Sequence, residues 1–99
     1  MAYLIEILLP TTGPEPLQES IGGIRDELAE RFGGATFHLN APAEGFWDDG
    51  DQVQHDGILV VEVMADIFDR AWWTGYKYRL QKQLKQDEVV IRSSFIERA

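Results

Sequence analysis

Four segments of the chain have the hydrophobic patterns of β-strands. Residues 3–9 are apolar apart from Glu6. Because successive side chains of a strand point to opposite faces, this segment predicts a strand with apolar residues on both faces. Residues 35–41 alternate between apolar and polar side chains, and residues 52–65 and 89–96 supply two further strands.

Two segments between these strands have the spacing of amphipathic helices. In each, large apolar side chains recur at intervals of three or four residues, which places them on one helical face. The first stripe is Leu17, Ile21, Ile24, Leu28 and Phe32, and the second is Trp72, Trp73, Tyr76, Leu80 and Leu84. Adjacent helical residues differ in direction by about 100°, so Trp72 and Trp73 cannot both point into the centre of the core.

Polar residues mark the ends of both helices. Thr12 and Glu15 fit a capping box before the first helix, and Gly33–Gly34 fits its C-terminal stop. Asp66 or Asp69 is placed to cap the second helix.

The predicted order is therefore βαββαβ, a ferredoxin-like α+β sandwich formed by residues 1–99 as one domain. We expect a four-stranded antiparallel sheet with both helices on one face. Asp49–Gly50 predicts a tight hairpin turn between the second and third strands. That turn places His38 opposite Val61 and Phe37 opposite Glu62, and a bulge near Pro42 or Gly57 would shift this register. His38 faces away from the helices if the Phe37 row faces them.

The second face of this sheet is not expected to be fully exposed to water. Leu4, Leu8, Val90 and Ile96 fall on the rows that the helices do not cover. We therefore expect a homodimer through the open sheet face, in which a second copy covers these side chains. A small ligand or another protein is the other partner to consider.

Composition and charge narrow the classes of function. The chain has no cysteine, so it has neither disulfides nor thiolate metal sites. Its formal net charge of −8 argues against nucleic-acid binding, which depends on basic side chains. The charge is uneven: residues 1–69 carry 14 acids and two arginines, whereas residues 70–99 carry seven basic residues and three acids.

The start of the sequence has no basic region followed by an apolar run, and no segment predicts a membrane span, so we expect a cytoplasmic protein.

Few residues are candidates for chemistry. His38 and His55 are the only histidines, and His38 is the candidate general acid-base residue. Trp47, Trp72 and Trp73 are candidate binding residues, together with His38, because aromatic side chains concentrate at contact surfaces. The acidic run around Asp48 lacks the spacing of a calcium loop, and no glycine-rich phosphate loop is present. We therefore expect neither a metal site nor a cofactor.

Some of these segments have a familiar arrangement. The chain resembles the DUF3574-like group of small uncharacterised bacterial proteins in residues 31–36 (RFGGAT), residues 45–50 (GFWDDG) and the later Leu80, Leu84, Gln86 and residues 89–91. The resemblance spans roughly residues 28–91 and rests on structural motifs. It implies a bacterial origin and a ferredoxin-like fold but transfers no catalytic residue. Relatives in that group often carry an export signal, which the start of this sequence does not resemble.

Two functions are the main candidates from the sequence, and a third is that the basic second helix (Lys77, Arg79, Lys82, Lys85) docks an acidic protein or an RNA. The first is a homodimeric binding or interaction module without catalysis. The alternative is a cofactor-independent enzyme of the dimeric α+β barrel kind acting on a small organic substrate. Its pocket would lie between sheet and helices, with His38 as acid-base residue and Trp47 or a ring of Trp72 or Trp73 as a wall.

Overall fold

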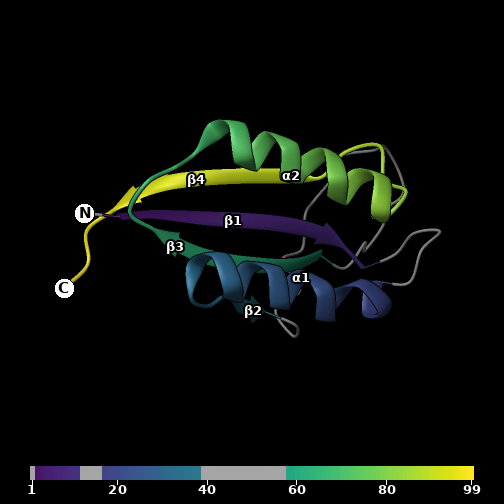
Figure 1. The fold of residues 1–99 in the computed structure, drawn as a ribbon, viewed down its shortest axis with the longest axis horizontal. Coiled ribbons are helices and arrows are strands. Elements are labelled where there is room, and N and C mark those ends of the chain that lie inside the picture. Colours follow the sequence, from purple (N-terminus) through teal and green to yellow (C-terminus); the bar gives the residue numbers. More distant parts are fainter. Residues whose placement is uncertain (1, 12–16, 39–57) are drawn as a thin grey trace, which may run out of the picture.

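The protein is built from two layers, a sheet of four antiparallel strands and a pair of helices packed against it (Figure 1). The computed structural model describes residues 2–11, 17–38 and 58–99. Its elements follow in the order β1 (Ala2–Pro10), α1 (Leu17–Phe32), β2 (Thr36–His38), β3 (Ile58–Ala65), α2 (Arg70–Gln83) and β4 (Val90–Ile96). The strands lie in the order β2-β3-β1-β4, so the chain has the predicted ferredoxin-like α+β fold.

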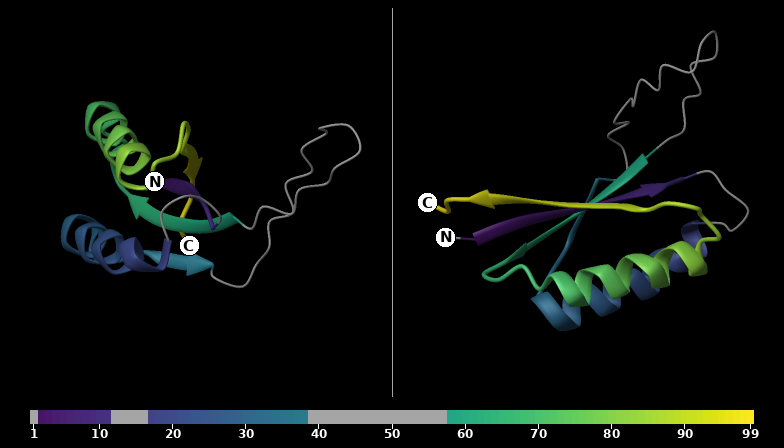
Figure 2. Two further views of the ribbon diagram at one scale, coloured as in Figure 1. Left: turned by 90° about the vertical axis from the view of Figure 1, so that its right-hand side faces the viewer. Right: turned by 90° about the horizontal axis from the view of Figure 1, so that it is seen from above.

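Both helices lie on the same side of the sheet, as the two views of Figure 2 show. The other side of the sheet is called the open face below. In the described part of the chain no helix covers it.

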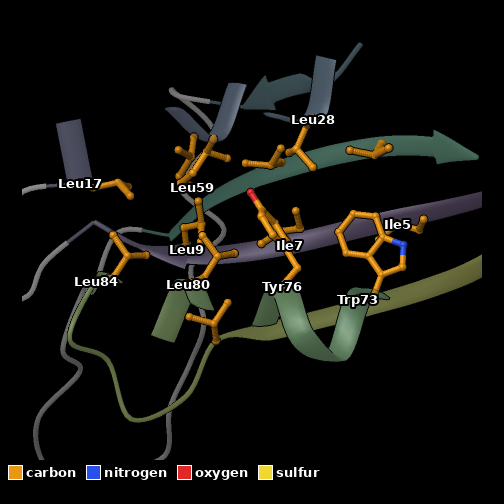
Figure 3. Close-up of a cluster of buried hydrophobic side chains, with 14 residues drawn as sticks. Ile5, Ile7, Leu9, Leu17, Leu28, Leu59, Trp73, Tyr76, Leu80 and Leu84 are labelled. Atoms are coloured by element: carbon orange, nitrogen blue, oxygen red, sulfur yellow. The ribbon is translucent and has the colours of Figure 1, made fainter. Parts of the chain in front are cut away.

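The hydrophobic core fills the space between the helices and the inner rows of the two central strands (Figure 3). Six inward side chains of β1 and β3 are at most 2% exposed: Ile5, Ile7, Leu9, Leu59, Val61 and Val63. The helices complete the core with Leu17, Ile24 and Leu28 from α1 and with Trp73, Tyr76 and Leu80 from α2. The inner row of β1 is the row that strand alternation selects from residues 3–9, which confirms the prediction for this segment.

The predicted pairing of β2 with β3 is wrong by one residue. His38 lies opposite Val60, and Phe37 lies opposite Val61 rather than Glu62. The prediction counted residues outward from the Asp49–Gly50 turn, and that turn lies outside the described residues. The face of His38 is nevertheless as predicted, because Phe37 packs against the core and the next side chain points the other way.

Local polar contacts set the helix boundaries. Of the two candidate caps for α2, Asp69 is the one used: its carboxylate accepts a hydrogen bond of 3.1 Å from the backbone N–H of Trp72. Gly33 follows α1 with a φ of +82°, the left-handed conformation that ends helices and favours glycine. The predicted capping box, Thr12 and Glu15, lies outside the described residues.

The structure separates the roles of the two adjacent tryptophans. Trp73 is 2% exposed and its ring stacks on Phe32 with a centroid distance of 5.2 Å. Trp72 is half-buried at the margin of the core, edge-on to Trp73 at 4.7 Å. The guanidinium of Arg31 lies over the Trp72 ring at 4.3 Å. One tryptophan is therefore a core residue, and the other joins the two helices at their surface.

A second contact joins the helices on their outer side. Arg79 of α2 donates two hydrogen bonds, of 2.8 and 3.2 Å, to the carboxylate of Glu27 on α1. Both side chains are substantially exposed, at 58% and 39%, so this pair adds about 1 kcal/mol at most.

Tyr76 gives the fold a predictable response to alkaline pH. Burial raises the pKa of Tyr76 well above its usual value, the nearby Glu27 carboxylate raises it further, and Arg79 only partly offsets these effects. The unfolded chain releases the phenolic proton of Tyr76 at about pH 10, whereas the folded chain retains it. The free energy of unfolding therefore falls as the pH rises above that value. The hydroxyl also has no hydrogen-bond partner among the described residues.

We therefore expect Tyr76→Phe to be at least as stable as the unmodified chain near neutral pH, with a gain of up to about 1 kcal/mol. Between about pH 8 and pH 11 the phenylalanine variant should lose less stability than the parent. Urea unfolding followed by circular dichroism at both pH values measures the difference, and the other tyrosines cancel because both proteins contain them. Equal losses in the two proteins would contradict the role assigned to Tyr76.

Candidate binding surface on the open face of the sheet

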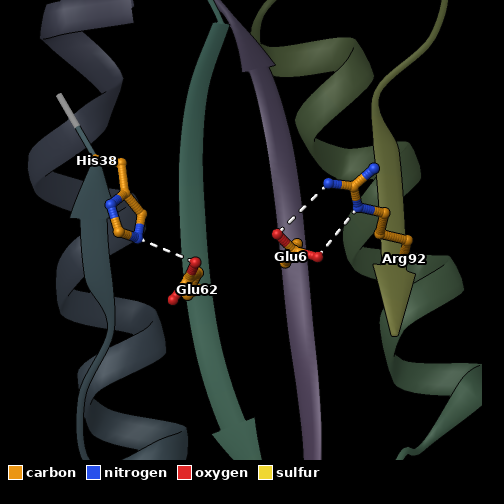
Figure 4. A network of polar contacts seen from close by, with 4 residues as sticks. All are labelled: Glu6, His38, Glu62 and Arg92. Atoms are coloured by element: carbon orange, nitrogen blue, oxygen red, sulfur yellow. Dashed lines mark hydrogen bonds and ion pairs between the residues drawn. The ribbon is translucent and has the colours of Figure 1, made fainter. Parts of the chain in front are cut away.

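The open face is organised in rows that run across the strands. Strand pairing places Glu62 of β3 opposite Glu6 of β1, and Glu6 opposite Arg92 of β4. These three residues form the charged row. His38 of β2 lies diagonally next to Glu62 and extends the row to the fourth strand, as Figure 4 shows.

Two side-chain contacts within ion-pair distance lie along the charged row. Arg92 donates from its Nε to Oε1 of Glu6 at 3.1 Å, and a second guanidinium nitrogen lies 3.5 Å from Oε2. At the other end, Nε2 of His38 lies 3.0 Å from Oε1 of Glu62. The His38 contact has ion-pair distance but is not aligned as a hydrogen bond. The two carboxylates at the centre are direct cross-strand neighbours, and like charges in such a position repel each other.

Apolar side chains flank the charged row on both sides. One neighbouring row consists of Val60, Leu8 and Val90, and the other of Met64, Leu4 and Ser94. Met64 and Val90 are 51% and 40% exposed, which is high for large apolar residues on a strand. The surface is therefore an apolar sheet face with a line of charge across its middle, and such surfaces are typical of contact sites.

A shallow depression of about 450 Å³ lies beside Glu62 at one end of this face. The segment of residues 32–36 forms one wall, and Leu4, Met64 and Arg98 form the rest. Its volume is within the range of small-ligand sites.

The structure places the predicted site residues in two separate regions. His38 lies on the open face, whereas Trp72 and Trp73 belong to α2 on the helix side of the sheet. The prediction of a pocket between sheet and helices that combines His38 with Trp72 or Trp73 is therefore wrong, because the sheet lies between His38 and these two rings. Trp47 lies outside the described residues, as do His55 and the acidic run around Asp48.

Three residues of the charged row were missed by the sequence predictions. Glu6 and Glu62 each interrupt an otherwise apolar strand, and a charged residue in such a position is a signal for a polar contact on the sheet face. Arg92 has the same signal in the last strand. The signal identifies each residue separately but does not reveal that the three lie in one row.

The described residues provide no other recognisable chemistry. Across residues 2–11, 17–38 and 58–99, no three histidine or acidic side chains are grouped as metal ligands. Within the same ranges, no helix is both long and apolar enough to cross a membrane.

No protein-family model, curated protein sequence or solved structure matches the chain. The resemblance to the DUF3574-like group thus stays a prediction.

Proposed function

We propose that this protein is a homodimeric interaction module and that the open face of its sheet is the surface that joins the two copies. The observation that carries the proposal is the apolar surface of this face, with Met64 and Val90 exposed at 51% and 40% around a charged row. Burial of such side chains contributes about 25 cal/mol per Å² of apolar area removed from water.

The charged row supports one particular arrangement of the two copies. When a two-fold axis runs along β1, between the stacked sheets, β3 of each copy faces β4 of the other. Glu62 then faces Arg92 of the second copy, and the reverse contact forms by symmetry. Glu6 faces its own counterpart at the axis, with the Arg92 guanidinium of the same copy beside each carboxylate. In the flanking row Val60 faces Val90 of the second copy, and Leu8 faces its own counterpart at the axis.

The same charges make one neighbouring axis less favourable. An axis between β1 and β3 places Glu6 against Glu62 of the second copy and gathers four carboxylates, with Arg92 of each copy only at the margin of the group. Repulsion between like charges at an interface disfavours that arrangement, so the charged row favours the axis along β1 over the axis between β1 and β3.

Leu8→Lys tests this proposal directly. The substitution puts two lysines against each other at the two-fold axis, so we expect the dissociation constant of the dimer to rise by about 100-fold or more. Size-exclusion chromatography with light scattering at micromolar concentration measures the mass of both proteins. The unmodified chain should be a dimer and the variant a monomer with an unchanged circular dichroism spectrum.

Tyr78→Lys is the matched control, because Tyr78 is a large side chain, 62% exposed, on the outer side of α2. It should leave the dimer intact. A monomeric unmodified chain, or equal effects of the two lysine substitutions, would reject the open face as the contact surface.

A cofactor-independent enzyme is the second candidate, and the contact between His38 and Glu62 favours it. A carboxylate beside an imidazole is the usual arrangement for orienting a general base. On a single copy this pair lies on an open surface, so catalysis would require the second copy to enclose it. A crystal structure of the dimer with a solvent-free, fully packed interface at His38 would argue against an enzyme, and an enclosed cavity there would support one.

A further inference from the structure

The outer edge of β4 is the feature of the molecule that neither the core nor the open face explains. Within the described residues β4 pairs with β1 alone, so its other edge presents unpaired backbone N–H and C=O groups over seven residues. Phe95, at 58% exposure, and Val90, at 40%, lie on this strand as well. The opposite edge of the sheet is formed by β2, of which three residues are described.

Edge strands of soluble proteins are normally protected against pairing with other chains. The usual devices are lysine, proline, a bulge or an inward-pointing charge. The sequence of β4, VIRSSFI, contains no lysine, proline or glycine. Its only charge belongs to Arg92, and that side chain is held over the open face by Glu6 at 3.1 Å. The edge is therefore accessible, and its sequence favours strand pairing.

The order of side chains along β4 fits antiparallel pairing with itself. With Ser93 at the two-fold axis, Arg92 lies opposite Ser94 of the second copy and Val90 opposite its Ile96. On the other face Ile91 lies opposite Phe95 of the second copy. Every large apolar side chain then meets another one, which is the type of cross-strand pair that stabilises sheets.

The two neighbouring registers lack this complementarity. Centring the pair on Arg92 places two guanidinium groups directly opposite each other. Centring it on Ser94 places Arg92 opposite Ile96 and Ser93 opposite Phe95. Like charges and mismatched polar and apolar pairs both weaken a strand pair, so the register centred on Ser93 is preferred.

We infer that β4 is a second self-association site, at which two copies join their sheets edge to edge in the antiparallel register centred on Ser93. The contact involves the sheet edge, so it is independent of the proposed dimer through the open face. Two seven-residue strands form a small interface, and contacts of that size are weak and transient. We therefore expect the edge contact to form at high protein concentration. At micromolar concentration, light scattering should report only the open-face dimer.

A single introduced cysteine tests the register, because the chain has none of its own. In antiparallel pairs directly opposite Cα atoms are about 4.5–5.5 Å apart, which is within the range that a disulfide bridges. Ser93→Cys should therefore form a covalent dimer under mild oxidation at high concentration. Non-reducing electrophoresis follows the rate, and peptide mapping confirms that the disulfide joins position 93 of one copy to position 93 of the other.

Ser94→Cys is the matched control, since Ser94 is the adjacent exposed serine of the same strand. In the proposed register its Cα lies about 8 Å from its counterpart, too far for a disulfide. We expect Ser93→Cys to cross-link about five times faster than Ser94→Cys or more. Equal rates would overturn the inference, and so would a faster rate for Ser94→Cys.

The double variant Leu8→Lys/Ser93→Cys separates this inference from the proposed function. Cross-linking through position 93 should persist in the double variant, whether or not the unmodified chain proves to be an open-face dimer. Loss of cross-linking in the double variant would show that position 93 meets its counterpart only within the open-face dimer, which would overturn the edge contact.

Discussion

Replacing Trp73 by alanine should lower the free energy of unfolding by about 3–5 kcal/mol. The side chain is 2% exposed and contacts rings from both helices, Phe32 at 5.2 Å and Tyr76 at 5.8 Å. Alanine leaves a cavity that the surrounding sheet and helices cannot close. Because domains of this size are stabilised by only about 5–15 kcal/mol, the loss is a large share of the total.

The neighbouring Trp72 provides the comparison. It is the same type of residue on the same helix but is half-buried. Trp72→Ala should therefore lower the free energy of unfolding by about 1–2 kcal/mol, mostly through the loss of its contacts with neighbouring rings and with the Arg31 guanidinium. Urea unfolding of both variants measures the two losses under identical conditions. A larger loss for Trp72→Ala would reverse the roles that the structure assigns to the pair.

Replacing Arg92 by leucine should cost about 1–2 kcal/mol at neutral pH, although the side chain lies on the surface. The reason is the carboxylate that it leaves behind. The Glu6 side chain is only 18% exposed and has Glu62 directly opposite, so without Arg92 two like charges face each other. Glu6→Gln in the same chain removes one of these charges, so the double variant should recover most of the lost stability.

Arg79→Leu is the control for this prediction. Arg79 also makes a two-point contact with a glutamate, but Glu27 is 39% exposed. Its loss should cost less than about 1 kcal/mol. Unfolding measured at two protein concentrations separates these effects from any change in association. Equal losses for the two arginine variants would mean that the neighbouring Glu62 has no effect.

Most of the fold could be predicted because it depends on local patterns. The stripe from Leu17 to Phe32 defines α1 at its observed bounds, and Asp69, one of the two candidate caps, caps α2. The apolar rows of residues 3–9 predict a strand, and the structure contains β1 there. Each of these features is set by neighbours within a few positions, so the sequence contains the necessary information.

The register and the site depend on residues far apart in the chain. The pairing of His38 with Val60 differs from the prediction by one position, because the prediction relied on a turn located many residues away. The charged row joins Glu6 to Arg92, 86 positions apart, and no local pattern indicates that contact. The separate roles of Trp72 and Trp73 likewise follow from the position of Phe32 on the other helix.

The place of β1 between β3 and β4 has a consequence for synthesis on the ribosome. Residues 2–10 are synthesised before residues 90–96, which form one of their two neighbouring strands. Until residues 90–96 emerge, the edge of β1 that β4 will cover remains unpaired, and β1 is a largely apolar strand. Non-local pairing of this kind slows folding and exposes the nascent chain to aggregation. Residues 2–10 of the growing chain are therefore a target for a chaperone that binds extended apolar segments.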